Sequence, residues 1–179
     1  VFSYIPPSAW AWRKGRAKDC AALADEIVAI FPHELPPYEK AGAHISFVGN
    51  PLIDTVHAEM PLADARRHFG IIEGDVPILL LPGSRREEIE RLLPAMLAAA
   101  KILHAQDPAR RFFLPVAGSV LKERVQEIIA SSGMTVTLTY DARYALMGIA
   151  RAAMAASGTV VMEAAIMGLP AVVLYRMSA

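Results

Sequence analysis

The sequence predicts an α/β protein with a Rossmann-like parallel sheet and flanking helices. Short apolar runs, which suit strands buried on both faces, alternate along the chain with helical patterns. The turns between them are rich in small residues. Hydrophobic residues make up 54% of the 179 residues, a high share that fits elements buried on several sides.

The first third of the chain alternates between strand and helix signals and then becomes polar. We expect strands at 1–5, 27–31 and 45–48, a helix at 17–26, and a turn with a helical stub at 33–42. From about Asn50 to Pro61 the pattern weakens. We therefore expect three parts: residues 1–52 in one domain, a linker at 53–62, and residues 63–179 in a second domain.

From residue 63 the alternation becomes regular. Strands are expected at 77–81, 111–116, 135–139, 152–156 and 171–175, and helices at 63–69, 86–104, 120–131 and within 140–150 and 159–167. The helix at 86–104 is the clearest, because its apolar residues keep the i, i+3, i+4, i+7 spacing of one buried face.

Composition excludes several classes of function. Eighteen basic residues balance eighteen acidic ones, so no global field favours nucleic acid. The single cysteine, Cys20, excludes an internal disulfide framework and fits a reducing compartment. No Cys/His cluster has zinc spacing, so we predict neither a metal nor a cofactor. No apolar run approaches the roughly 20 residues that cross a bilayer.

Two strand-to-helix turns are candidates for a ligand site. Residues 82–85 (Pro-Gly-Ser-Arg) and 156–159 (Ala-Ser-Gly-Thr) each follow an expected parallel strand. Ligands of open parallel sheets bind beyond the carboxyl ends of the strands, so both turns should face one cleft. Glycine allows close backbone approach, and Arg85 offers a fork of donors to an anionic oxygen. Neither turn matches a P-loop or G-x-G-x-x-G, which disfavours a kinase or a dehydrogenase.

Glu163 is a lone carboxylate in an otherwise apolar helix, where burial is costly unless something hydrogen-bonds it. It could pair with a structural arginine such as Arg151 or Arg176. It could equally accept hydrogen bonds from ribose hydroxyls, as acidic residues do in dinucleotide folds. With phosphate at the preceding turn, the second interpretation gives a nucleotide site.

Both tryptophans, Trp10 and Trp12, lie in one proline-rich segment near the N-terminus. They could pack in the core, or they could form the apolar lip of a cleft with cations nearby. The residues alone leave both interpretations open.

Several segments together resemble the successive motifs of the lipid-A-disaccharide synthases. They are Tyr-Ile-Pro-Pro-Ser-Ala-Trp-Ala-Trp-Arg at 4–13, Phe-Pro-His-Glu at 31–34, Phe-Val-Gly-Asn-Pro-Leu at 47–52, Leu-Leu-Pro-Gly-Ser-Arg at 80–85, Ala-Ser-Gly-Thr at 156–159 and Val-Leu-Tyr-Arg-Met at 173–177. The resemblance covers nearly the whole chain in order. Its Trp-Ala-Trp and Leu-Pro-Gly-Ser-Arg segments are specific, whereas Ser-Gly-Thr followed by Glu is shared with related nucleotide-sugar transferases.

The resemblance implies a two-domain GT-B glycosyltransferase. Such enzymes join UDP-2,3-diacylglucosamine to 2,3-diacylglucosamine 1-phosphate, form the β-1,6 disaccharide of lipid A with inversion, release UDP and need no metal. Residues 1–52 would be the C-terminal part of the acceptor domain, and residues 63–179 a truncated UDP-sugar (donor) domain. The lipid substrates imply peripheral association with the cytoplasmic face of the inner membrane.

The same resemblance assigns roles to individual residues. The donor diphosphate would contact Gly83, Ser84 and Arg85, with Glu88 in support. The phosphates would also lie near Ser157, Gly158 and Thr159, and the ribose near Glu163. The interdomain cleft or the acyl chains would lie near Trp10 and Trp12. Two residues depart from the family pattern: Asn50 and Pro6 stand where members commonly have His and Ser. The catalytic base is expected before Val1, so we expect this chain alone to bind UDP weakly and to turn nothing over.

Two alternatives stay open. One is another GT-B enzyme that uses UDP-N-acetylglucosamine, such as the peptidoglycan glycosyltransferase or an epimerase, although the Trp-Ala-Trp segment argues against it. The other is a non-catalytic nucleotide-binding or assembly module, which would share the two turns and need no acceptor.

Overall fold

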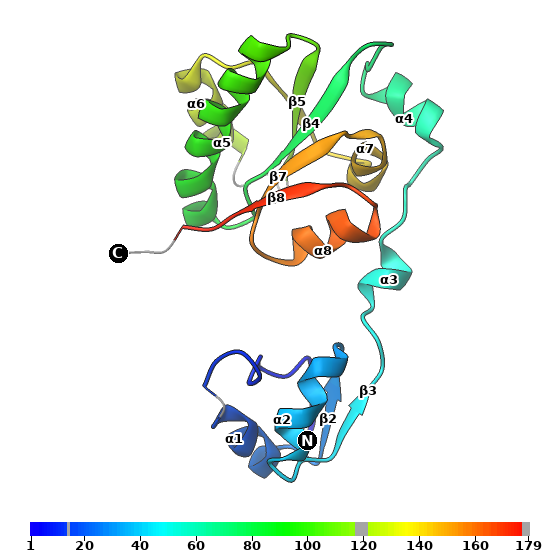
Figure 1. Cartoon of the computed structure of the whole chain (residues 1–179), viewed down its shortest axis with the longest axis vertical. Coiled ribbons are helices and arrows are strands. Elements are labelled where there is room, and N and C mark those ends of the chain that lie inside the picture. The colour runs from blue at the N-terminus through cyan, green and yellow to red at the C-terminus, as the bar shows by residue number, and fades with distance from the viewer. Residues whose placement is uncertain (14, 117–121, 177–179) are drawn as a thin grey trace. The chain divides into compact units, whose positions relative to one another are not determined.

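The computed structural model describes residues 1–13, 15–116 and 122–176. The chain divides into two compact units, Val1–Thr55 and Val56–Ala179 (Figure 1). The division falls within the segment 53–62. Each unit is an α/β structure with a parallel sheet of its own.

The first unit is built on a three-stranded parallel sheet of order β1-β2-β3. Its strands are β1 (Phe2–Tyr4), β2 (Glu26–Ala29) and β3 (Ile45–Phe47), and its helices are α1 (Arg16–Leu23), the 3-10 turn η1 (Pro32–Glu34), α2 (Leu35–Glu39) and α3 (Leu52–Thr55). The helix predicted at 17–26 was wrong at its C-terminal end. Ala24 is already extended, with φ −114° and ψ 132°, and Glu26 begins β2.

A buried tyrosine holds the proline-rich segment of the first unit in place. Tyr38 is fully buried together with Ala9 and Ile27. Its hydroxyl donates a hydrogen bond to the carbonyl oxygen of Pro7 over 2.7 Å. Burial raises the pKa of Tyr38 to about 12, with smaller contributions from nearby Cys20 and Glu34. The neutral hydroxyl of buried Tyr38 therefore holds the loop that carries both tryptophans.

The second unit has a five-stranded, all-parallel sheet of order β6-β5-β4-β7-β8. Its strands are β4 (Val76–Leu81), β5 (Arg110–Pro115), β6 (Val136–Thr139), β7 (Ala152–Ala156) and β8 (Ala171–Leu174). Its helices are α4 (Leu62–His68), α5 (Arg86–Gln106), α6 (Lys122–Ser132), α7 (Arg143–Ile149) and α8 (Thr159–Ile166). The predicted turn at 117–119 and the predicted helix start at Val120 and Leu121 lie outside the described residues.

The strands of this sheet are apolar on both faces, as the sequence predicts. Along β4, Ile78 and Leu80 face a core formed with α5 and α6, whereas Leu79 and Leu81 face a core that includes residues of α7 and α8. Figure 1 shows α5 and α6 on one side of the sheet and α7 and α8 on the other. This doubly wound packing explains the continuous apolar runs.

The strand order places a switch point between β4 and β7. From β4 the chain proceeds to β5 and β6 in one direction, and it then returns to place β7 and β8 on the opposite side. β4 and β7 are direct neighbours, with Leu81 paired to Ala155 at their carboxyl ends. The loops after these two strands leave toward opposite faces of the sheet, which opens a crevice between them.

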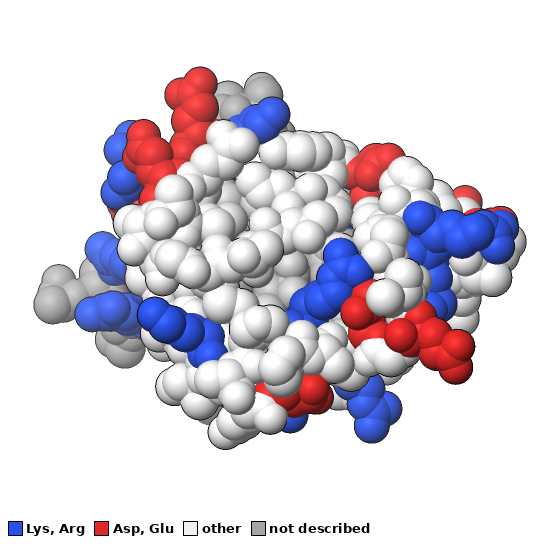
Figure 2. Space-filling model, turned by 90° about the horizontal axis from the view of Figure 1, so that it is seen from above, with Lys and Arg blue, Asp and Glu red and all other residues white. Residues whose placement is uncertain are grey.

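On the face drawn in Figure 2, basic and acidic side chains lie near one another around a largely uncharged centre. Within the described part of the chain, no helix is both long enough and apolar enough to span a membrane.

The buried tyrosine makes the stability of the chain sensitive to alkaline pH. The unfolded tyrosine ionises near its ordinary pKa of 10, whereas folded Tyr38 stays neutral to about 12. Protons are therefore lost first from the unfolded state, and the free energy of unfolding should fall by about 2 kcal/mol between pH 10 and 12.

Tyr38→Phe should remove this part of the pH dependence, and Tyr175→Phe, which changes an exposed tyrosine, should keep it. Denaturant unfolding at several pH values measures both. Equal slopes in the wild-type and Tyr38→Phe chains would contradict the assignment.

Candidate functional site

A pocket of about 620 Å³ lies in the second unit, beside the carboxyl ends of β4 and β7. All eight residues assigned to the donor site in the sequence line it: Gly83, Ser84, Arg85, Glu88, Ser157, Gly158, Thr159 and Glu163. The two small-residue turns therefore share one pocket. It lies at the switch point of the sheet, where open α/β folds bind ligands.

The turn after β4 is shaped by the contact between a glycine and a carboxylate. Gly83 has φ +98°, and a Cβ built on it would collide with the carboxylate of Glu88. Glu88 also accepts a hydrogen bond from the backbone N–H of Arg85 (3.4 Å) and pairs with the Arg85 guanidinium (3.0 Å). Glu88 thus caps α5 and holds Arg85, whose side chain is 83% exposed. An anion that reaches Arg85 would share it with Glu88.

The turn after β7 leaves the start of α8 open. Gly158 occupies the N-cap position, and no side chain from the described part of the chain caps the helix there. No described atom lies within 4 Å of a Cβ built on Gly158, and its backbone is extended. The first N–H groups of a helix lack helical partners and carry positive partial charge. This turn can therefore accept an anionic group close to the backbone.

Glu163 is the buried carboxylate of the pocket, with only 6% of its surface exposed. Its Oε1 accepts hydrogen bonds from Arg143 Nη2 (3.0 Å) and from the Tyr144 hydroxyl (3.3 Å). Neither arginine suggested by the sequence, Arg151 or Arg176, is the partner. Both are near in sequence, but the loop before α7 brings Arg143 to the pocket instead.

Sequence reasoning missed a second carboxylate, Glu59. It lines the pocket and accepts hydrogen bonds from the backbone N–H groups of Tyr144 (3.3 Å) and Ala145 (2.7 Å). The sequence predicts a polar linker at 53–62, yet Glu59 caps α7 from more than 80 positions away. One signal existed: Ala142, at the N-cap position of α7, has no side chain that could cap it.

The loop between β6 and α7 forms another wall that sequence reasoning missed. Thr139, Tyr140, Asp141 and Ala142 line the pocket. Ala142 is held in the left-handed region at φ 46°, a strained conformation for a residue with a side chain. Within the described residues, the hydroxyl of Thr139 is buried without a hydrogen-bond partner. Nothing in the sequence of this loop distinguishes it from an ordinary connection.

The two tryptophans belong to the first unit and are not core residues. Trp10 is 48% exposed and Trp12 71% exposed, so the core-packing interpretation was wrong. Trp10 meets the ring of His33 edge-on, with centroids 4.6 Å apart, and Arg13 lies 5.7 Å over Trp12. Their contact with a cleft or acyl chain stays a prediction.

Asn50 is largely buried, and its side-chain oxygen accepts a hydrogen bond from the backbone N–H of Leu52 (3.0 Å), the first residue of α3.

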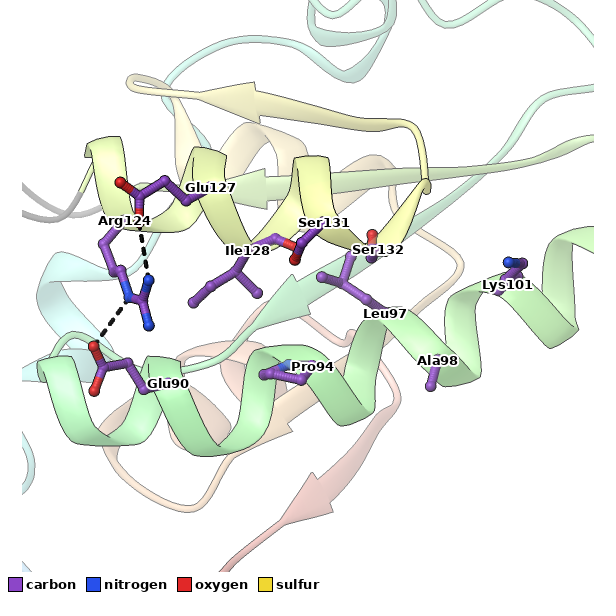
Figure 3. A pocket seen from close by; sticks show the side chains of 10 residues that line it. All are labelled: Glu90, Pro94, Leu97, Ala98, Lys101, Arg124, Glu127, Ile128, Ser131 and Ser132. Carbon is purple, nitrogen blue, oxygen red and sulfur yellow. Dashed lines mark hydrogen bonds and ion pairs between the residues drawn. The ribbon is translucent and has the colours of Figure 1, made fainter.

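A second hollow lies between α5 and α6 (Figure 3). Its arginine, Arg124, is held by Glu90 (3.0 Å) and Glu127 (2.9 Å), and Pro94 and Ile128 line the gap. None of the predicted site residues borders it. Arg124 is thus already paired with two carboxylates, and the other cation of this hollow, Lys101, is exposed. Among the residues the structure describes, no group of three His, Cys, Asp or Glu side chains could hold a metal.

Comparison with known proteins decides the family. The model of the lipid-A-disaccharide synthetase family matches residues 1–179. The chain belongs to this family. It is 42% identical over 178 residues to the lipid-A-disaccharide synthase of Geobacter sulfurreducens and 42% identical over 180 residues to that of Syntrophus aciditrophicus. These alignments cover 99–100% of this chain but only 46–47% of the two relatives. The chain therefore spans about half the length of the curated relatives it matches.

Solved structures support the same fold class. The UDP-GlcNAc 2-epimerase from Neisseria meningitidis bound to UDP-GlcNAc superposes with a TM-score of 0.66 at 17% identity, over 88% of this chain and 46% of that one. A glycosyltransferase from Rickettsia africae gives 0.57 at 16% identity, over 96% and 50%. These likenesses show that this chain shares a Rossmann-like fold with the epimerase and the glycosyltransferase.

The two pocket glycines should differ in their tolerance of a methyl group. Gly83→Ala should lower the free energy of unfolding by about 1–3 kcal/mol, because φ is positive and Glu88 is in the way. Gly158→Ala should lower it by less, at most about 1 kcal/mol, since its backbone is extended and its surroundings are open, and the remaining loss reflects alanine being a poorer N-cap residue than glycine. Denaturant unfolding compares the pair. Equal losses of stability would contradict the backbone assignment.

Proposed function

We propose that the second unit binds the UDP part of a UDP-sugar donor and that the chain is the donor-binding half of a lipid-A-disaccharide synthase. The single observation that carries this proposal is the pocket at the β4–β7 switch point. There, a cationic turn, an uncapped helix start and a buried carboxylate meet in one cavity. The family match over the whole chain supports the same donor.

Each wall of the pocket suits a different part of UDP. Arg85 and the start of α8 supply positive charge for the diphosphate. The same groups would stabilise the negative charge that develops on UDP as it leaves the sugar. Glu163, on the second turn of α8, can accept hydrogen bonds from ribose hydroxyls. Glu88 supports this arrangement by fixing Arg85.

The full reaction extends the proposal beyond this pocket. The donor would be UDP-2,3-diacylglucosamine and the acceptor 2,3-diacylglucosamine 1-phosphate, joined with inversion to the β-1,6 disaccharide of lipid A. Residues 1–52 would belong to the acceptor domain, where Trp10 and Trp12 would lie near the cleft or acyl chains. The base would come from outside this chain. Such substrates would place the protein at the inner face of the inner membrane.

Calorimetry with UDP tests the donor site. The wild-type chain should bind UDP, and Arg85→Ala and Glu163→Ala should each weaken binding about 10- to 100-fold, because each removes a charge-assisted hydrogen bond. Gly158→Ala should also weaken it, since a methyl group would occupy the space the phosphate needs.

Arg151→Ala and Glu73→Ala serve as controls, because both side chains are exposed and lie outside the pocket. Their UDP affinity should match wild type. Binding that neither Arg85→Ala nor Glu163→Ala weakens would show that the site lies elsewhere. Absence of UDP binding would favour the assembly-module alternative.

Transfer itself is tested in a full-length protein that carries this chain. With the diacylated UDP-glucosamine donor and the acylated acceptor, Arg85→Ala should lower kcat by about 100-fold or more through lost stabilisation of the leaving UDP. Release of UDP measures the rate. Full activity in the isolated 179 residues would contradict the assignment of acceptor chemistry to another part of the protein.

A further inference from the structure

Glu163 poses an energetic problem that α8 cannot solve by itself. Only 6% of the residue is exposed. The other residues of α8 are Thr, Val, Met, Ala and Ile. A buried carboxylate without a hydrogen-bonded partner costs several kcal/mol. A residue outside α8 must therefore supply a hydrogen-bonded partner for the Glu163 carboxylate.

That residue is Arg143, the first residue of α7. Its Nη2 lies 3.0 Å from Glu163 Oε1 and 2.6 Å from the Tyr144 hydroxyl, which in turn donates to the same oxygen. The three side chains form a closed triangle. Both contacts fall on Oε1, and within the described parts of the chain no hydrogen bond reaches Oε2. The arrangement thus anchors one oxygen and leaves the other for a ligand.

Arg143 is itself held in place from several directions. Its guanidinium carbon lies 4.6 Å over the ring of Tyr144. Glu59 accepts the N–H groups of the next two residues, which fixes the start of α7. Ala142, just before it, keeps its strained left-handed backbone. The position of Arg143 is thus fixed by the cap from Glu59, by the left-handed backbone of Ala142 and by the contact with the Tyr144 ring.

We propose that Arg143 is a positioning residue of the nucleotide site, which turns the Glu163 carboxylate toward the ribose. This inference rests on the proposed function and deepens it. Arg143 would act through Glu163 and not by direct contact with UDP. Its removal should therefore affect recognition of the ribose hydroxyls and leave the diphosphate contacts intact.

The test compares UDP with 2′,3′-dideoxy-UDP, which lacks the hydroxyls. The wild-type chain should bind UDP about 10- to 100-fold more tightly, as expected for charge-assisted hydrogen bonds. Arg143→Ala should weaken UDP about tenfold and leave the dideoxy analogue within about twofold, so that the preference collapses. Arg143→Lys, which keeps the charge, should restore part of it.

Additivity separates positioning from direct contact. If Arg143 acts through Glu163, the double variant Arg143→Ala/Glu163→Ala should bind UDP no more weakly than Glu163→Ala alone. Arg151→Ala is the matched control, an exposed arginine of the same unit, and should change neither affinity. Should Arg143→Ala unfold, Arg143→Gln and Tyr144→Phe carry the test, and both should lower the preference for UDP.

The outcomes are distinguishable. Equal weakening of both nucleotides by Arg143→Ala, or losses that add to those of Glu163→Ala, would overturn the positioning role in favour of direct contact. An unchanged preference in every folded Arg143 and Tyr144 variant would overturn it in favour of a purely structural pair. If the wild-type chain binds neither nucleotide, the proposed function fails first and the inference fails with it.

Discussion

The reversal of strand order between β4 and β7 is the constraint on which the rest of the second unit depends. A parallel sheet needs a crossover helix for every strand, and each crossover must pack on one face. When the chain returns from β6 to place β7 beside β4, the helix of this crossover, α7, and the helix after β7, α8, pack on the other face. The two central loops then diverge, and the pocket is the space they leave. The ligand site is a consequence of topology before it is a matter of side chains.

Topology was predictable because its signals are local. Strands buried on both faces, such as β4 and β7, are continuous apolar runs, and the amphipathic pattern of α5 marks one face over its whole length. The small residues at 83–84 and 157–159 are likewise identified from adjacent positions in the sequence. These features fix where the turns are, and the general geometry of parallel sheets then brings them together.

The partners of the pocket carboxylates were not predictable from the same information. Glu163 lies 20 positions from Arg143, and Glu59 lies 85 and 86 positions from the N–H groups it caps. Such pairs depend on how α7 approaches α8, which no periodicity encodes. The sequence offered two nearer arginines for Glu163, and proximity along the chain was the wrong guide. The exposure of Trp10 and Trp12 depends in the same way on tertiary context, since the buried anchor of their loop is Tyr38.

The cap that Glu59 provides has a practical consequence for dissecting the protein. A shortened chain that begins at residue 63, where the regular alternation starts, would keep every strand of the second sheet and all eight donor-site residues. It would nevertheless lose the carboxylate that satisfies the first N–H groups of α7. Cutting between Thr55 and Val56, where the compact units separate, retains it. The useful boundary for isolating the nucleotide-binding unit is thus set by a hydrogen bond and not by the first residue of a helix.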